Sequence, residues 1–320
     1  MAKVGGVDLS RLVGAAYRAV PSAGPPPTAQ PEDCAVLGRI DGSILTTTDF
    51  GPLVGPDMYR AGRISATHAM SDVYAMGGMP LFATAMLIVD PSLPARAASD
   101  VEAGMLAACH EDGVQLVGGH TVEGKEAMAG LSVTGIAGEK LLTKGGARPG
   151  DVLMLSKAVG AGLVVRAWRE GILGFTDLEA ALASMETSNR AAAIAAVAAG
   201  AVAATDVTGF GLLGHLAEGL ASDRLGAMVF LERVPVIPTA TRVPASFTRS
   251  RWLNDNLDYC HNRMRLIGER DRIRIAPLLD PQTSGGLLVA VPAAGVDELR
   301  HGGFAAIGTV TSERHLELVA

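Results

Sequence analysis

The chain has few cysteines, few aromatic side chains and no long apolar segment. Its three cysteines, Cys34, Cys109 and Cys260, are scattered and odd in number, which argues against a disulfide framework and for a reducing cytoplasm. We therefore expect each of them to be a small buried hydrophobic side chain. No apolar run approaches the roughly 20 residues of a membrane-spanning helix, and the first residues lack the apolar core of a signal peptide. These absences predict a cytoplasmic protein with no membrane partner.

An excess of positive charge is also missing. The formal net charge is −6, whereas nucleic-acid-binding domains usually present a basic patch, so we expect no nucleic-acid partner. Aromatic residues make up only 4% of the chain, but 39 glycines are present. Glycine permits tight turns and close approach of the backbone to other groups. Such positions are common where successive backbone amides bind a phosphate group.

Helix-like and strand-like segments follow each other along the chain. This pattern predicts an α/β (α+β) fold with two domains, residues 1–154 and 155–320, each long enough for a core of its own. The expected helices cover residues 9–20, 58–76, 94–112, 161–171 and 187–200. The expected strands cover residues 43–48, 81–89, 114–117, 131–137, 226–231 and 286–292. The proline-rich stretch 21–31 predicts a loop.

Four aspartates stand in unusual local sequences. Asp33 lies in PEDCAV, Asp49 ends an expected strand in TTTDF, Asp72 lies in SDVYAMGG, and Asp206 lies in ATDVTGFG. None has a basic partner at helical i,i+4 spacing, and an unpaired carboxylate among apolar side chains is costly. Mg²⁺ removes this cost, because it binds carboxylate oxygens and joins them to nucleotide phosphates. Each aspartate alone could be a strand-end or helix-cap residue, but the four together favour a metal–nucleotide site.

Three glycine-rich segments are candidates for loops at this site. Residues 118–121, Gly-Gly-His-Thr, follow a short apolar strand and could offer amides and a hydroxyl to an anion, although alone they are typical of a plain turn. Residues 209–214 match the G-x-G-x-x-G pattern, but their position predicts a turn that opens a helix rather than a NAD site. His215 on that helix is interpreted as structural. Residues 280–286, DPQTSGG, precede an apolar strand and fit a structural role or a role lining the site equally well.

These segments, in this order, resemble selenophosphate synthetase, the selenide, water dikinase family. The matching stretches are TTTDF at 46–50, GRISATHAMSDVYAMGGMP at 62–80, LVGGHTVEG at 116–124, ATDVTGFGLLGHL at 204–216 and DPQTSGGLL at 280–288. The wider superfamily includes aminoimidazole ribonucleotide synthetase and a hydrogenase-maturation protein. The resemblance implies the two-domain α/β architecture and the ATP chemistry of this superfamily. The sequences of the last two stretches are similar to those of its selenium branch.

The resemblance implies a reaction in which ATP, selenide and water give selenophosphate, AMP and phosphate. It also implies a homodimer whose N-terminal domains pair through their sheets, with ATP near the interface. The residues that match the family's Mg²⁺ ligands are Asp33, Asp72 and Asp206, and those that match its contacts to Mg-ATP are Asp49 and Asp72. Gln30, Pro31 and Glu32 match a segment that contacts ATP mainly through its backbone. Gly119, His120 and Thr121 match a turn that the neighbouring subunit offers to ATP.

The start of the chain departs from the family pattern. The family carries a Cys or selenocysteine followed three positions later by a Lys, and Lys3 matches this catalytic Lys. The nucleophile would then stand immediately before Met1. We favour the hypothesis that an upstream selenocysteine codon, UGA, was read as a stop, because the gap falls on that one position. The alternatives are a nucleotide-binding paralogue that makes no selenophosphate, or another ATP-dependent synthetase of the superfamily, which would form ADP rather than AMP.

Overall fold

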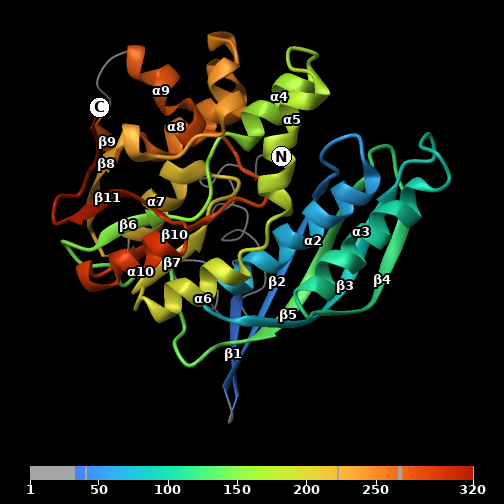
Figure 1. The fold of residues 1–320 in the computed structure, drawn as a ribbon, viewed down its shortest axis with the longest axis horizontal. Coiled ribbons are helices and arrows are strands. Elements are labelled where there is room, and N and C mark those ends of the chain that lie inside the picture. Colours follow the sequence, from blue (N-terminus) through green and yellow to red (C-terminus); the bar gives the residue numbers. More distant parts are fainter. Residues whose placement is uncertain (1–32, 40–41, 222, 266–268, 320) are drawn as a thin grey trace, which may run out of the picture.

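The computed structural model describes residues 33–39, 42–221, 223–265 and 269–319 (Figure 1). The strands are β1 (Ala35–Arg39), β2 (Gly42–Pro52), β3 (Met79–Val89), β4 (Gln115–Glu123), β5 (Met128–Ile136), β6 (Val152–Leu155), β7 (Ala203–Asp206), β8 (Gly226–Phe230), β9 (Met264–Arg265), β10 (Leu287–Val291), β11 (Ala305–Thr311) and β12 (Leu316–Val319). The α-helices are α2 (Met58–Ala75), α3 (Ala97–Glu111), α4 (Ala161–Arg169), α5 (Phe175–Glu186), α6 (Arg190–Ala198), α7 (Gly211–Ala221), α8 (Arg251–His261), α9 (Glu269–Leu279) and α10 (Val296–His301). Within these ranges, no helix combines the length and the apolar character needed to cross a bilayer.

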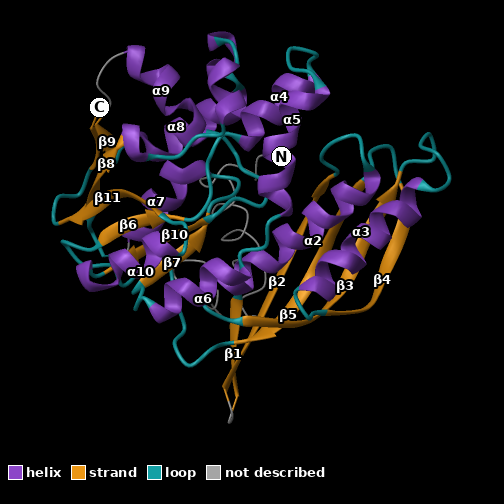
Figure 2. Cartoon of the chain, viewed as in Figure 1, coloured by secondary structure: helices purple, strands orange, loops and turns teal. Residues whose placement is uncertain are grey.

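The first sheet contains five strands in the order β1-β2-β5-β3-β4. Neighbouring strands are antiparallel except β3 and β4, which run parallel. A parallel pair needs a crossover connection, and α3 provides it. Helices α2 and α3 lie over one face of this sheet (Figure 2).

Helix α2 is bounded by a cap at each end and packs closely on α3. Asp57 precedes it and accepts a hydrogen bond from Arg60 N at 3.1 Å, and Gly77 follows it with a left-handed φ of 68°. A Cβ atom at Gly62 would lie 2.0 Å from the carbonyl oxygen of Val101 on α3. The small residues of α2 therefore allow the backbones of the two helices to touch.

The second sheet contains seven strands in the order β7-β10-β6-β11-β8-β12-β9. Strand β10 is buried along its whole length, and its side chains alternate between two hydrophobic clusters. Leu288 and Ala290 pack with the residues of α7. Leu287, Val289 and Val291 pack in the cluster that also contains residues of α6, α2 and the first sheet. One face of the second sheet therefore shares a core with the first sheet, which places α2 between the two sheets.

The structure confirms most of the predicted elements and corrects several bounds. Predicted helices at 58–76, 94–112, 161–171 and 187–200 correspond to α2, α3, α4 and α6, and each predicted strand has a counterpart. Strand β2 continues to Pro52, so Asp49 does not end the strand as predicted. It lies inside β2 and pairs with Leu131 on β5. Helices α5, α8, α9 and α10 and strands β9, β11 and β12 were not predicted. The predicted helix 9–20 and the loop 21–31 lie outside the described residues.

The predicted secondary structure of residues 114–121 was partly wrong. Gly118, Gly119, His120 and Thr121 belong to strand β4 rather than to a turn, and β4 is largely exposed rather than buried. The pairing with β3 continues through Gly119, His120 and Thr121 after a register shift beside Gly118. The two glycines indicated a turn, whereas the strand accommodates one of them at an irregularity and the other against the carbonyl of Ala85.

Candidate functional site

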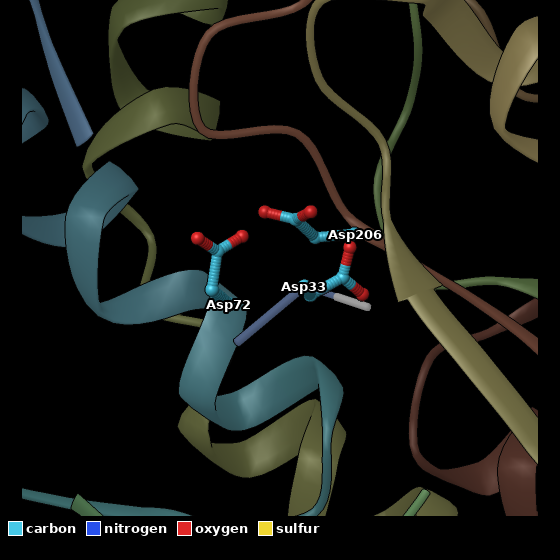
Figure 3. A group of neighbouring side chains, drawn as sticks. All are labelled: Asp33, Asp72 and Asp206. Atoms are coloured by element: carbon cyan, nitrogen blue, oxygen red, sulfur yellow. The ribbon is translucent and has the colours of Figure 1, made fainter. Parts of the chain in front are cut away.

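Three carboxylates meet where the two sheets share their core. Ligand oxygens of Asp33, Asp72 and Asp206 lie within 4.8 Å of one another. Asp33 precedes β1, Asp72 lies in the last turns of α2, and Asp206 is the last residue of β7. Figure 3 shows the Asp72 and Asp206 carboxylates facing a common space, with Asp33 beside them. The structure thus brings together the three residues that the sequence analysis assigned to metal binding.

Hydrogen bonds hold two of these carboxylates in place. Thr47 on β2 donates its hydroxyl proton to Asp72 Oδ2 at 2.5 Å. Thr205 on β7 donates to Asp33 Oδ1 at 3.2 Å. Asp206 is only 1% exposed and Asp72 only 7% exposed. Like charges at such short separations repel strongly away from water, so a cation at the centre would stabilise the arrangement.

A lysine that the sequence analysis missed supplies one such cation. Lys144 Nζ lies 3.1 Å from Asp33 Oδ1 and 3.2 Å from Glu218 Oε2, and its side chain is 7% exposed. Burial by itself lowers the pKa of Lys144, but the carboxylates of Asp33 and Glu218 outweigh burial and raise that pKa above its ordinary value. Lys144 is therefore a charged residue, fixed between two carboxylates from distant parts of the chain.

His215 extends this network, as a structural residue would. Its side chain is 2% exposed, its Nε2 lies 3.2 Å from Thr208 Oγ1, and its Nδ1 lies 3.7 Å from Glu218 Oε2. Its ring also packs on Phe210 at a centroid distance of 5.5 Å. These contacts fix the turn between β7 and α7, the segment of the G-x-G-x-x-G match, which opens a helix as predicted.

Asp49 lies beside the three-carboxylate cluster without being part of it. Its Oδ2 atom is 3.7 Å from His68 Nε2 on α2. His68 Nδ1 in turn accepts a hydrogen bond from Ser284 N at 3.2 Å. The electric field of the four aspartates is felt at Cys34, because burial and then the charges of Asp72, Asp33, Asp206 and Asp49 raise the pKa of its thiol. All four predicted carboxylates are therefore in one electrostatic environment.

Gly119, His120 and Thr121 are not brought to the carboxylates of their own chain. Asp49 pairs with Leu131, Leu131 with Ala85, and Ala85 with Gly119, so Asp49 and Gly119 occupy one row across the sheet. Three strand spacings of about 4.8 Å separate their backbones by roughly 14 Å. A direct contact of both with one phosphate group in one chain is therefore excluded by the register.

The DPQTSGG segment has both of the roles that the sequence left open. Gln282 Oε1 accepts hydrogen bonds from Gly160 N and Ala161 N, each at 3.0 Å, and Asp280 Oδ2 accepts one from Leu163 N at 2.6 Å. These bonds satisfy the first amides of α4, which has no side-chain cap of its own. Ser284, further along the segment, contacts His68 and so lines the site.

Lys157 is a second basic residue near the site that was not predicted. It follows β6, and its Nζ donates hydrogen bonds to Thr187 O at 2.5 Å and to Ser284 O at 3.0 Å. Burial lowers its pKa to about 7, although the charge of Asp206 acts in the opposite direction. The sequence offered no sign of this role, since LSKAVGAG contains no feature that separates Lys157 from a surface lysine.

The remaining predicted site residues, Lys3, Gln30, Pro31 and Glu32, lie outside the described residues. The three cysteines are free and buried, as predicted. The donor set at the cluster consists of carboxylate oxygens from three separate elements, which is the chemistry that Mg²⁺ prefers. The residues present therefore fit a magnesium site.

Comparisons with known proteins identify the same family as the sequence motifs. The chain matches the family model of the AIR synthase related protein N-terminal domain over residues 31–137 and that of the C-terminal domain over residues 148–320. It is 37% identical to a selenide, water dikinase from Myxococcus xanthus, over 82% of this chain and 76% of that protein. It is 39% identical to the selenide, water dikinase of Photorhabdus laumondii, over 84% of this chain and 78% of that protein.

Solved structures share the fold at lower identity. A thiamine monophosphate kinase from Aquifex aeolicus is 19% identical with a TM-score of 0.68, over 96% of this chain and 95% of that chain. A hydrogenase maturation protein HypE from E. coli is 17% identical with a TM-score of 0.64, over 87% of this chain and 82% of that chain. Both similarities support the two-sheet architecture.

Proposed function

Since this chain belongs to the selenide, water dikinase family of the AIR synthase related proteins, we propose that it converts ATP, selenide and water into selenophosphate, AMP and phosphate. The observation that carries the proposal is the meeting of Asp33, Asp72 and Asp206 within 4.8 Å. Three carboxylates from three elements, two of them almost fully buried, have no evident purpose in a protein that does not bind cations.

We propose Asp33, Asp72 and Asp206 as the ligands of Mg²⁺. When bound, Mg²⁺ would neutralise phosphate charge and orient the phosphate chain. The protein's own contribution is to hold the ligands rigidly, through Thr47 on Asp72 and through Thr205 and Lys144 on Asp33. Preorganised ligands of this kind lower the barrier because they need little rearrangement during the reaction.

The ATP contacts come from several segments. We propose that Asp49 and Asp72 contact Mg-ATP, that residues 30–32 contact ATP through their backbone, and that Lys3 is the catalytic lysine that offsets phosphate charge. The proximity of Asp49 to His68 and to the cluster supports its assignment. Lys3 and residues 30–32 rest on the family pattern alone.

We propose a homodimer in which Gly119, His120 and Thr121 serve the partner's ATP. The register places these residues roughly 14 Å from Asp49 of their own chain, so a second chain is the simplest way to use them. Exposed apolar residues on β3 and β4, among them Phe82, Val117 and Val122, support a sheet-to-sheet contact.

The proposed domain division stays at residues 1–154 and 155–320, with ATP binding and dimerisation in the first part. The strands of the first sheet end at Ile136, and those of the second begin at Val152, which supports a division in this region. The three free cysteines support the cytoplasm as the location.

The product nucleotide tests the function directly. The protein is incubated with ATP, Mg²⁺ and selenide, and the nucleotides are separated while selenophosphate is followed by phosphorus NMR. Selenide-dependent AMP and selenophosphate support the proposal, whereas ADP indicates another synthetase. Binding without turnover, also in a variant with a Cys placed immediately before Met1, indicates a nucleotide-binding protein. Asp206→Asn keeps the volume but removes a ligand charge, so we expect AMP formation to fall about a hundredfold. Asp297→Asn, a change at an exposed position of α10, is the control and should leave the rate unchanged.

A further inference from the structure

The Lys157 amino group lies near the carboxylate cluster and makes no ion pair with a carboxylate of the described residues. Its Nζ donates to two backbone carbonyl oxygens, those of Thr187 and Ser284. An ammonium group has three N–H donors, so one remains for another acceptor. Neutral carbonyls orient the charge but do not neutralise it. Because burial lowers the pKa of Lys157 to about 7, an anionic ligand beside it would favour the charged ammonium form.

The segment beside Lys157 is built with close backbone packing. A Cβ atom at Gly285 would lie 2.0 Å from Val207 O, and one at Gly286 would lie 2.5 Å from Lys157 N. Ser284 adopts a left-handed φ of 49°, a conformation that costs energy for a residue with a side chain. The segment Ser284–Gly286 therefore packs closely between Lys157 and Val207.

Unpartnered polar atoms surround the same segment. Ser284 is 1% exposed, and its Oγ has no hydrogen-bond partner among the described residues. Asn189 is also 1% exposed and donates through Nδ2 to Gly285 O at 2.8 Å and to Ser71 Oγ at 2.9 Å. Its Oδ1 likewise lacks a partner in the described part of the chain. Buried polar atoms of this kind normally find a partner, and a ligand or its water can supply one.

We propose that Lys157 and Ser284 form a phosphoryl-binding subsite, which takes the terminal phosphate of ATP beside the carboxylate cluster. This inference rests on the proposed function and adds two residues to it. The N–H and O–H donors suit phosphate oxygens, and a lysine ammonium is a common point-charge partner for phosphate. The carboxylates of the cluster repel an anion, so a cation beside them is needed to hold the terminal phosphate. Lys157 can supply this cation. The same chemistry would hold free phosphate, a product of the reaction.

Calorimetric titration of the full chain tests this subsite. The probes are adenylyl imidodiphosphate, AMP and inorganic phosphate, each with Mg²⁺ and without selenide. For Lys157→Met we expect the Kd of adenylyl imidodiphosphate to rise at least tenfold while that of AMP changes less than twofold. Loss of phosphate binding with unchanged imidodiphosphate affinity would assign the subsite to the released product instead. Because no turnover is needed, a failure to form selenophosphate leaves these results readable.

Two further variants guard against indirect effects. Lys140→Met removes a lysine that also donates to a backbone carbonyl, Gly200 O, but lies on the exposed connection after β5, and it should change no affinity. Ser284→Gly removes the hydroxyl and suits the φ of 49°, so it should keep the fold and still weaken imidodiphosphate binding severalfold. Unchanged affinities for all probes in both Lys157→Met and Ser284→Gly, or an equal loss for AMP, would overturn the proposal.

Discussion

Asp33 depends on a lysine far along the chain. Its carboxylate is 5% exposed and lies beside two other aspartates, where a lone negative charge would be costly. Lys144 meets this charge at 3.1 Å and shares its own charge with Glu218 at 3.2 Å. The three groups form one ion network, in which the Lys144 ammonium balances part of the negative charge before any metal binds.

Replacement of Lys144 by methionine should therefore destabilise the protein strongly. Lys144→Met would leave Asp33 and Glu218 buried without the cation between them, and removing one partner of a buried pair costs about 3–5 kcal/mol. The free energy of unfolding from urea titration measures this loss. The matched variant Glu218→Gln keeps the Lys144–Asp33 pair, so it should cost much less. Equal losses in the two variants would contradict this account of the network.

At the scale of single residues, the sequence located the carboxylates better than their partners. Asp33, Asp72 and Asp206 were assigned from local sequence and family resemblance, and the structure brings them together. Lys144 and Lys157 were not found, because contacts between residues far apart in the chain leave no mark at a fixed spacing. The structural interpretation of His215 fits its burial and its contacts with Thr208 and Glu218.

Helix α4 illustrates how one element relies on another for its cap. It begins after Gly160, which has a left-handed φ of 102° and no side chain to offer. Gln282 and Asp280, which lie between α9 and β10, bind its first amides instead. Asp280 is fully enclosed, and burial raises its pKa from the ordinary 3.8 to about 7, although the hydrogen bond from Leu163 N acts in the opposite direction.

This shift predicts a stability that falls as the pH rises. Between about pH 4 and pH 7 the folded protein keeps the Asp280 proton that the unfolded chain has lost, so the unfolded state binds fewer protons. The contribution of Asp280 to the unfolding free energy then decreases with rising pH, by at most about 1.4 kcal/mol per pH unit. Asp280→Asn removes this dependence while its Oδ1 can still accept from Leu163 N. Urea titrations of both proteins across this range measure the difference, and parallel curves would contradict the shift.

At the scale of elements, whether a segment forms a helix or a strand was easier to predict than where that helix or strand begins and ends. Helices α2 and α3 were predicted within a few residues because their small and apolar residues recur at helical spacing. Strand β4 was cut short at Gly118-Gly119, since glycine pairs usually end a strand, whereas pairing with β3 carries this strand on to Glu123. The contacts of the whole sheet overrode the local preference.

At the scale of the whole molecule, α2 joins the two sheets. It packs on the first sheet and on α3 at one side, and on α5, α6 and β7 at the other (Figure 1). Its residue Asp72 can therefore meet Asp33 from the first sheet region and Asp206 from the second. The sequence predicted two α/β parts, but the shared core between them depends on contacts between residues far apart, which no local pattern contains.

The proposed dimer gives the sharpest test at this scale, because each site would combine groups from two chains. Asp206→Asn disables a site in its own chain, and His120→Glu, which places a negative charge on exposed β4, disables the site of the partner. Each variant alone should bind adenylyl imidodiphosphate weakly. After the two are unfolded together and refolded as a mixture, half of the dimers are mixed, and one of their two sites has neither change, so about a quarter of the sites should regain wild-type affinity. The stoichiometry of titration measures this fraction, and size-exclusion chromatography with light scattering checks that dimers have formed. If His120 served its own chain, every site in the mixture would carry one change and no high-affinity sites would appear.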